Sequence, residues 1–304
     1  MKTAVLIPCY NEGITIRKVV QDFKRELPDA DIYVYDNNSS DNTSSEALAA
    51  GAIVRKEPMQ GKGCVVRSMF RDIDADLYVM VDGDDTYPAS FVHEIMKPVI
   101  DGTADMSIGD RLSNGSYYRE NTRSFHNLGN DMVTFAINHF FKVKLTDIMT
   151  GYRCFSRRFV DAFPVLNDGF QLETEMTLFA LNYKMHIVEI PIEFSERPEG
   201  SFSKLSTLKD GYRVLMCIFN MYRHYRPLSF FGAISLVLIA ASLAIGIPTI
   251  VEFAQTHFVS KVPSAVLASG IFIMAILFYI CGLILDTVEK TSRQSTEQKI
   301  KSTK

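Results

Sequence analysis

The chain has 304 residues, enough for one α/β domain of ordinary size and a further segment. Its formal net charge is −3, and the acidic excess lies in residues 1–226, which argues against a nucleic acid as the partner. The five cysteines have no paired spacing for zinc or disulfides, which fits a reducing compartment.

Residues 1–227 carry charges throughout and alternate short apolar runs with helical patterns. Runs of strand length are found at 3–8, 31–36, 52–54, 76–82 and 104–110. Helical patterns are found at 14–27, after the polar segment NNSSDNT, at 62–73 and at 88–101. This alternation predicts an α/β domain with a mostly parallel sheet and helices on both faces.

Polar clusters follow three of the predicted strands: Tyr10-Asn11-Glu12, Asp36, and Asp82-Gly83-Asp84-Asp85. Because ligands of such sheets bind outside the carboxyl ends of the strands, we expect these clusters to line one site. A diphosphate held there needs a hard divalent cation, and such a cation takes carboxylate oxygens. The aspartates of the third cluster are therefore the predicted metal ligands, although an isolated pair of this kind is often a solvated turn.

Residues 228–286 contain few ionisable groups. Leu228–Val251 and Ser264–Leu285 each exceed the ~20 residues that cross a ~30 Å hydrocarbon core as a helix. Soluble helices seldom lack a polar face for so long, so we expect two transmembrane helices rather than a pair of buried core helices.

Basic residues flank these two segments unevenly. Arg223 and Arg226 precede the first segment, and residues 287–304 hold five cations against two anions, whereas Lys261 is the one fixed cation in the loop at 252–263. The positive-inside rule places the large domain and the tail in the cytoplasm. We expect the tail to be solvated and disordered.

Residues 204–227 have apolar side chains near helical spacing together with five fixed cations. This pattern predicts an amphipathic helix at the membrane interface, and a helix packed on the globular domain is the alternative.

Nine segments, in order, resemble the family 2 glycosyltransferases of GT-A fold, a Rossmann-like α/β fold. The branch they resemble contains dolichyl-phosphate mannose synthases and bacterial polyprenyl-phosphate glycosyltransferases. The segments are IPCYNE (7–12), YDNNSSDNT (35–43), GKG (61–63), VDGDDTYP (81–88), GDRLS (109–113), ENTRSFHNLGN (120–130), TDIMTGYRCFSR (146–157), GFQLETEM (169–176) and ERPEGSFSKL (196–205). The resemblance implies an inverting enzyme that moves a sugar from a nucleotide donor to a polyprenyl phosphate at the cytoplasmic membrane face.

The resemblance also implies donor-side roles. The segment that lines the nucleotide base and ribose matches Pro8, Tyr10, Asn11 and Glu12. Asp36 matches a carboxylate that contacts the base, and Lys62 lies where the donor is bound. Asp82 and Asp84 match the pair that holds Mg²⁺ or Mn²⁺ against the diphosphate, with Asp82 also near the nucleotide. Thr86 stands where the mannose synthases usually have a glutamine, so a third side-chain ligand is not implied.

Basic and hydroxyl residues in the remaining motifs are the candidates for binding the acceptor phosphate: Arg111, Arg123, Arg153, Arg197, Ser201 and Lys204. A surface ion pair is the alternative for each arginine. Asp147 is the candidate catalytic carboxylate, either as a base or as an orienting group, because a phosphate monoester with a second pKa near ~6 is already largely a dianion at neutral pH. Glu173 and Glu175 are interpreted as sugar or acceptor contacts, with helix packing or capping as the alternative.

A UDP-sugar, UDP-glucose or UDP-N-acetylglucosamine, is the favoured donor because the Asp36 position suits uracil, and GDP-mannose is the second candidate. The acceptor would be undecaprenyl or dolichyl phosphate. Two other functions stay open: extension of a glycolipid or polysaccharide, and an inactive membrane scaffold that partners a flippase. Association through the apolar helices into a homo-oligomer also stays open. The expected organisation is a GT-A domain, an interfacial helix, a two-helix anchor and a basic tail, at 1–203, 204–227, 228–286 and 287–304.

Overall fold

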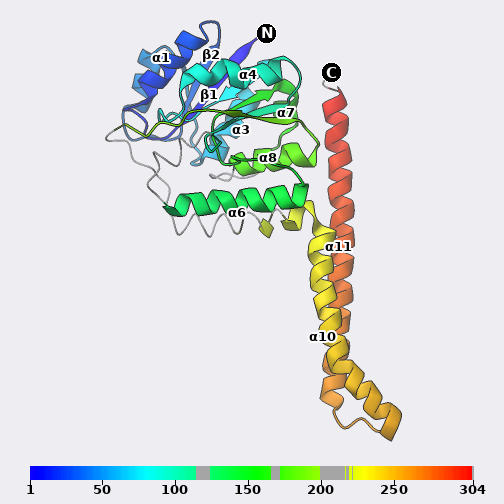
Figure 1. Ribbon diagram of the computed structural model, residues 1–304. Coiled ribbons are helices and arrows are strands. Elements are labelled where there is room, and N and C mark those ends of the chain that lie inside the picture. The colour runs from blue at the N-terminus through cyan, green and yellow to red at the C-terminus, as the bar shows by residue number, and fades with distance from the viewer. Residues whose placement is uncertain (114–123, 166–171, 199–215, 217–218, 221, 303–304) are drawn as a thin grey trace. The chain divides into compact units, whose positions relative to one another are not determined.

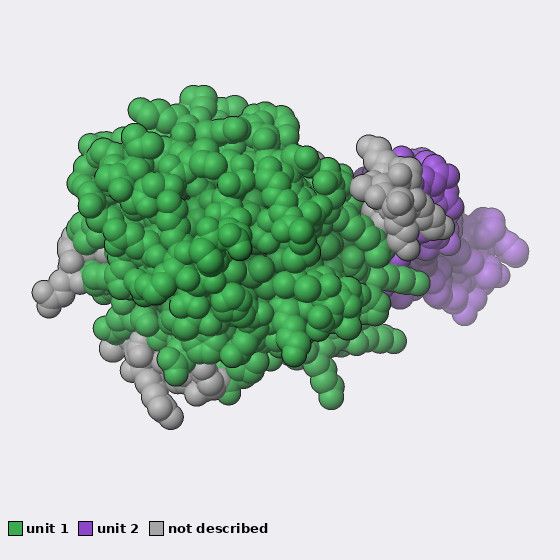
Figure 2. All heavy atoms as spheres, turned by 90° about the horizontal axis from the view of Figure 1, so that it is seen from above, with its two compact units in different colours: residues 1–214, 299–304 green, residues 215–298 purple. Residues whose placement is uncertain are grey.

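The structure, a computed structural model, describes the chain except for residues 114–123, 166–171, 199–215, 217–218, 221 and 303–304. The chain forms two compact units, one of residues 1–214 with 299–304 and the other of residues 215–298 (Figure 2).

Within the described residues, the larger unit contains a seven-stranded sheet with the order β3-β2-β1-β4-β6-β5-β7 (Figure 1). The strands are β1 (Thr3–Cys9), β2 (Asp31–Asp36), β3 (Ile53–Lys56), β4 (Leu77–Met80), β5 (Met106–Asp110), β6 (Arg153–Ser156) and β7 (Ile187–Pro191). Strand β6 runs antiparallel to β4 and β5, and the other neighbouring pairs are parallel. The predicted mostly parallel α/β sheet is confirmed, while β6 and β7 were not predicted.

Helices cover both faces of this sheet. The helices described in this unit are α1 (Ile16–Glu26), α2 (Thr43–Ala49), α3 (Lys62–Asp72), the 3₁₀ turn η1 (Ala89–Phe91), α4 (Val92–Ile100), α6 (Ser124–Phe141), α7 (Arg157–Ala162) and α8 (Leu172–Asn182). The helix predicted at 88–101 is thus a 3₁₀ turn followed by an α-helix. It begins after Pro88, whose backbone is extended.

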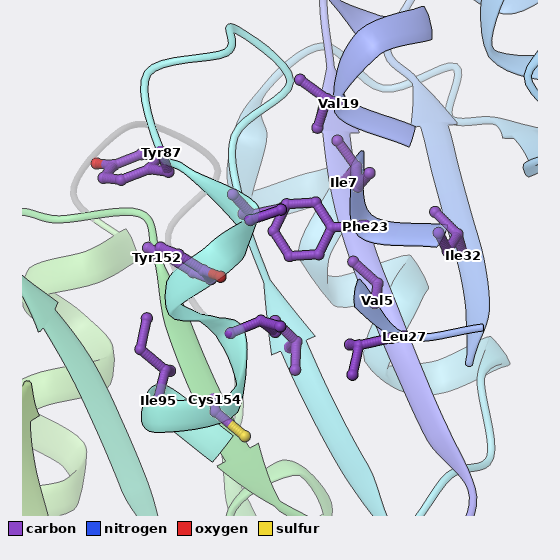
Figure 3. Close-up of a cluster of buried hydrophobic side chains, with 14 of the residues drawn as sticks. Val5, Ile7, Val19, Phe23, Leu27, Ile32, Tyr87, Ile95, Tyr152 and Cys154 are labelled. Atoms are coloured by element: carbon purple, nitrogen blue, oxygen red, sulfur yellow. The ribbon is translucent and has the colours of Figure 1, made fainter. Parts of the chain in front are cut away.

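The side chains of β1 show why both faces need cover. Val5 and Ile7 pack in one core with residues of α1, α2 and α4, and Figure 3 shows Phe23 of α1 beside them. Ala4 and Leu6 point into a second core with residues of α3, α7 and α8. A strand buried on both faces is apolar at successive positions, which explains the continuous run in the sequence.

The smaller unit contains two long helices, α10 (Pro227–Thr256) and α11 (Val262–Ser302), both long and apolar enough to cross a membrane. Hydroxyl groups on α10 bind backbone carbonyls on α11. The Ser235 Oγ donates to the Ala275 oxygen at 2.8 Å, and the Ser242 Oγ donates to the Ala268 oxygen at 2.8 Å. The serines on α10 and the alanines on α11 are each seven residues apart, and their small side chains let the two backbones approach. Close contacts of this kind are typical of helix pairs in membranes.

The tail prediction was wrong in one respect, because α11 continues as far as Ser302. Ion pairs one helical turn apart support this extension, between Asp286 and Lys290 at 2.6 Å and between Arg293 and Glu297 at 3.4 Å. Most of residues 204–227 lie outside the described residues, so the interfacial helix stays a prediction.

Candidate active site

The strand order reverses between β1 and β4, and ligands of α/β sheets bind at such a switch point. The loops that follow β1, β2 and β4 are joined there by hydrogen bonds. The Asn11 N–H donates to the Ser39 Oγ at 2.8 Å, and the Asn11 Oδ1 accepts from the Ser40 N–H at 2.8 Å. The Thr15 Oγ1 donates to the Gly83 oxygen at 2.6 Å. The three polar clusters found in the sequence therefore meet at one edge of the sheet.

The other residues predicted to line the nucleotide lie at the same edge. Pro8 is half-buried in β1, Tyr10 is exposed and Glu12 is buried. Asp36 is also buried, and its carboxylate accepts hydrogen bonds from the Ser39 N–H at 2.9 Å and from the Ser44 hydroxyl. Asp36 thus holds the loop after β2 in place, and its contact with a base stays a prediction.

Lys62 begins α3 after Gly61, whose φ of 135° lies in a region that favours glycine. The Lys62 Nζ lies 2.5 Å from the Asp82 Oδ1 and 2.5 Å from the Glu173 Oε1. Burial by itself lowers the pKa of Lys62, but the two carboxylates outweigh burial and raise that pKa above its ordinary value. Lys62 is therefore a fixed positive charge beside the first aspartate of the predicted metal pair.

Asp84 is buried, and both of its carboxylate oxygens accept hydrogen bonds. The Oδ2 accepts from the Arg197 Nη2 at 2.5 Å, and the Oδ1 accepts from the Thr86 Oγ1 at 2.6 Å. Burial, followed by the neighbouring Asp82, raises the pKa of Asp84, and Arg197 opposes this shift. Thr86, at the position where the mannose synthases usually have glutamine, thus orients a predicted metal ligand.

Asp82 and Asp84 fit a divalent cation that is shared with a diphosphate. Among the described residues there is no group of three or more His, Cys, Asp or Glu side chains that could hold a metal. Mg²⁺ is commonly bound by one or two carboxylates together with substrate phosphates, so two aspartates suffice. A Cβ atom added at Gly151 would collide with the Asp82 carboxylate, so that carboxylate is closely packed on one side.

Arg111 and Asp147 form a bidentate ion pair. The Arg111 Nε lies 2.7 Å from the Asp147 Oδ2, and the Arg111 Nη2 lies 2.9 Å from the Asp147 Oδ1. Asp147 is fully buried, and its backbone N–H donates to the Glu189 Oε1 at 2.9 Å. Both carboxylate oxygens are used by the guanidinium fork, and this arrangement suits an orienting group better than a free base.

Arg153 differs from the expectation that it binds the acceptor phosphate. Its side chain is fully buried, and its guanidinium donates to the Thr150 oxygen at 3.0 Å, to the Ile148 oxygen at 2.5 Å and to the Thr177 Oγ1 at 2.9 Å. Burial lowers the pKa of Arg153 to about 10. This arginine supports the 148–150 turn from within the protein.

Residues 4–163 match the protein family described as Glycosyl transferase family 2. The chain belongs to this family. It is therefore an enzyme, a glycosyltransferase. Glycosyltransferase AglJ of Haloferax volcanii is 28% identical over 298 residues, which cover 97% of this chain and 96% of that protein. The undecaprenyl-phosphate mannosyltransferase of Micrococcus luteus is 26% identical, over 68% of this chain and 88% of its own.

Solved structures agree on the fold of this glycosyltransferase. Glucosyl-3-phosphoglycerate synthase of Mycobacterium tuberculosis, solved in complex with Mn²⁺, uridine diphosphate and phosphoglyceric acid, gives a TM-score of 0.59. The match has 17% identity and covers 72% of this chain and 78% of that chain. The GT-A fold is thereby confirmed.

The sequence analysis interpreted Glu173 as a sugar or acceptor contact and did not pair it with Lys62. It also missed Tyr87, whose hydroxyl accepts from the Gly151 N–H at 3.0 Å and lies 3.3 Å from the Arg111 Nη1. Burial raises the pKa of Tyr87 to about 12, so this hydroxyl stays neutral. The one signal in the sequence that could have indicated Tyr87 is its place in the VDGDDTYP segment. Arg123, Ser201 and Lys204 lie outside the described residues.

Proposed function

We propose that this glycosyltransferase moves a sugar from a nucleotide donor, preferably a UDP-sugar, to a polyprenyl phosphate at the cytoplasmic face of a membrane. One observation carries the proposal: the aspartate pair at the switch point is flanked by the cations Lys62 and Arg197, in a chain with two long apolar helices. The names of relatives that act on polyprenyl phosphates, and the nucleotide and Mn²⁺ complex of the structural neighbour, support it.

On the donor side, Asp82 and Asp84 would hold Mg²⁺ or Mn²⁺. A bound divalent cation would stabilise the charge that develops on the departing nucleoside diphosphate. Lys62, held by Glu173, adds a second positive charge beside the same group. The loops at 10–12 and 36–43 would line the base and ribose, and Asp36 would suit the uracil N3–H.

On the acceptor side, the phosphate of the lipid would attack the anomeric carbon directly, with inversion. Such a phosphate is already largely a dianion at neutral pH, so it needs positioning more than deprotonation. Arg111, fixed by Asp147 and lying 5.9 Å from the centre of the Tyr87 ring, is placed to supply positive charge there. Arg197 is a second candidate, and Arg123, Ser201 and Lys204 remain proposed members of this phosphate site.

The helices α10 and α11 would span the membrane, with residues 204–227 at its interface. The asymmetry of basic residues supports a cytoplasmic position for the catalytic domain and the tail. A single cysteine in the loop at 257–261, in a background that lacks the native cysteines, should react with an impermeant thiol reagent outside intact cells. One at 290–304 should not, and the reverse pattern would place the catalytic domain where nucleotide sugars are not made.

The direct test uses the purified full chain in lipid nanodiscs. It is incubated with radiolabelled UDP-glucose, UDP-N-acetylglucosamine or GDP-mannose, each with undecaprenyl or dolichyl phosphate and Mn²⁺. We expect label in the organic phase from one UDP-sugar, and loss of that label in EDTA. Labelling from GDP-mannose alone would identify GDP-mannose, and not a UDP-sugar, as the donor. A parallel incubation supplies a preformed glycolipid in place of the lipid phosphate. Labelling of this glycolipid alone would favour an extending glycosyltransferase, and no transfer with any combination would favour a scaffold.

A further inference from the structure

Arg197 occupies an unusual position, because it contacts a carboxylate that the proposed function reserves for a metal. Its Nη2 lies 2.5 Å from the Asp84 Oδ2, and its Nη1 lies 3.7 Å from the Glu12 Oε1. The other Asp84 oxygen accepts from Thr86. A divalent cation bound at the Asp84 Oδ2 would lie against the Arg197 guanidinium, which carries the same sign of charge, so the contact between Arg197 and Asp84 must yield when the metal binds.

The segment that carries Arg197 is anchored to the site by its backbone. The Ile192 N–H donates to the Asp110 oxygen at 2.9 Å, and the Ser195 N–H donates to the Thr86 oxygen at 3.1 Å. Between them, the Phe194 ring packs edge-on against Tyr87 with ring centres 6.2 Å apart. These contacts hold the segment beside the site, so the position of Arg197 next to Asp84 depends on the fold as well as on the ion pair itself.

The two cations beside the aspartate pair are held differently. Lys62 lies 2.5 Å from Glu173 as well as 2.5 Å from Asp82, so it keeps a close partner if Asp82 binds a metal. Arg197 lies 2.5 Å from Asp84 and 3.7 Å from Glu12. A metal at Asp82 would therefore leave Lys62 in contact with Glu173, whereas a metal at Asp84 would face the Arg197 guanidinium directly.

We propose that Arg197 is the internal counterion of Asp84, that it competes there with the divalent cation, and that donor binding releases it toward the acceptor phosphate. The release to the acceptor rests on the proposed function, but the competition at Asp84 does not. The consequence is an order of binding, because the acceptor phosphate gains its arginine only after the metal and the nucleotide are bound. By linkage, the metal–nucleotide complex and the acceptor strengthen each other's binding by the same factor.

The test measures metal binding directly in the full chain in nanodiscs. Free Mn²⁺ is followed by electron paramagnetic resonance during titration, and UDP or GDP is added to Mn²⁺-saturated protein in a calorimeter. Arg197→Gln is compared with the wild type and with a matched control, Lys18→Gln. The control removes one positive charge next to the same acidic segment, because the Lys18 Nζ pairs with the Asp85 Oδ1 at 2.6 Å.

We expect Arg197→Gln to bind Mn²⁺ about tenfold more tightly than the wild type, within the usual range of coupling between sites. Lys18→Gln should bind Mn²⁺ within about twofold of the wild type, as exposed pairs contribute little. Weaker or unchanged Mn²⁺ binding by Arg197→Gln overturns the competition, and weaker UDP binding would make Arg197 a donor ligand instead. An equal gain in both variants would be an effect of overall charge and would also overturn it. If Arg197→Gln does not fold, Arg197→Met, which also removes the charge but keeps a long side chain, must show the same gain.

A second arm tests the release. Undecaprenyl phosphate in the nanodisc should raise the affinity of the wild type for Mn²⁺ and UDP together, and this coupling should vanish in Arg197→Gln. Tighter Mn²⁺ binding by the variant, without any lipid coupling in the wild type, would keep the competition and reject the release. Failure of the proposed function would instead appear as absence of sugar transfer by the wild type, whatever the result for Mn²⁺.

Discussion

The proposed donor side and the proposed acceptor side of the site are built in different ways. On the donor side, three short loops directly follow neighbouring strands and are joined to one another by hydrogen bonds, as between Asn11 and Ser39. On the acceptor side, pairs form between residues far apart in the chain, such as Arg111 with Asp147. The donor loops are fixed by the sheet topology itself, whereas Arg111 on the acceptor side, like Arg197, is positioned by a long-range ion pair.

The two sides also differ in the sign of the charge that needs neutralising. On the donor side, two carboxylates pair with cations, the half-buried Asp82 with Lys62 and the buried Asp84 with Arg197. On the acceptor side, a cation is met by a buried carboxylate, Asp147 on Arg111. Removing a donor carboxylate should therefore affect metal binding, and removing an acceptor carboxylate should affect the placement of an arginine.

The largest expected effect is on the donor side. Asp84→Asn should reduce sugar transfer by about 10³-fold or more, because one carboxylate fewer leaves the diphosphate charge poorly neutralised in the transition state. Transfer rates are measured with saturating donor across a Mn²⁺ titration. Asp85→Asn is the matched control, since Asp85 pairs with Lys18 instead, and it should stay within a few-fold of the wild type. Full activity of Asp84→Asn would remove this residue from the metal site.

The next effect tests whether Arg153 belongs to the acceptor side at all. Arg153→Met should lower the free energy of unfolding by about 2–4 kcal/mol, because the carbonyl groups of Ile148 and Thr150 lose a buried donor. Thermal unfolding of the wild type and the variant measures this. Arg111→Lys, which keeps a positive charge beside the buried Asp147, should destabilise less while reducing transfer more. If Arg153→Met unfolds like the wild type and loses only affinity for the lipid, the original acceptor role would be restored.

A smaller effect is expected for Asp147→Asn. If Asp147 is an orienting group, its replacement should lower the rate of transfer by about 10-fold. Removal of a general base typically lowers a rate by about 10²–10⁴-fold. Asparagine keeps the shape but loses the charge that fixes Arg111. Rates of the two proteins measured between pH 5 and 9 should rise in parallel through about 6, where the acceptor phosphate loses its second proton. If the wild type keeps a rise of rate with pH that the variant loses, Asp147 is the base.

Much of the donor side could be predicted from the sequence because its determinants are local. An apolar run followed by Asp82 and Asp84 identifies a strand end, and parallel strands bring such ends together. The acceptor side could not be predicted as well. The sequence does not show whether an arginine in a motif lies in a site, like Arg111, or inside the protein, like Arg153. The burial of Arg153 follows from the position of β6 between β4 and β5, and this antiparallel strand does not follow from the alternation of strands and helices.

The smallest expected effect concerns Thr86, where local sequence and long-range packing meet. Its hydroxyl donates to the Asp84 Oδ1 at 2.6 Å, while Arg197 contacts the other oxygen. Thr86→Val keeps the shape and removes this hydrogen bond, which should weaken the apparent affinity for Mn²⁺ by about fivefold, or roughly 1 kcal/mol. Thr86→Ser keeps the hydroxyl and should bind Mn²⁺ like the wild type. If Thr86 only filled space, the valine variant would match the wild type, and the serine variant, one methyl group smaller, would be the weaker of the two. The two substitutions therefore separate orientation of the metal ligand from packing, with opposite rank orders in the same titration.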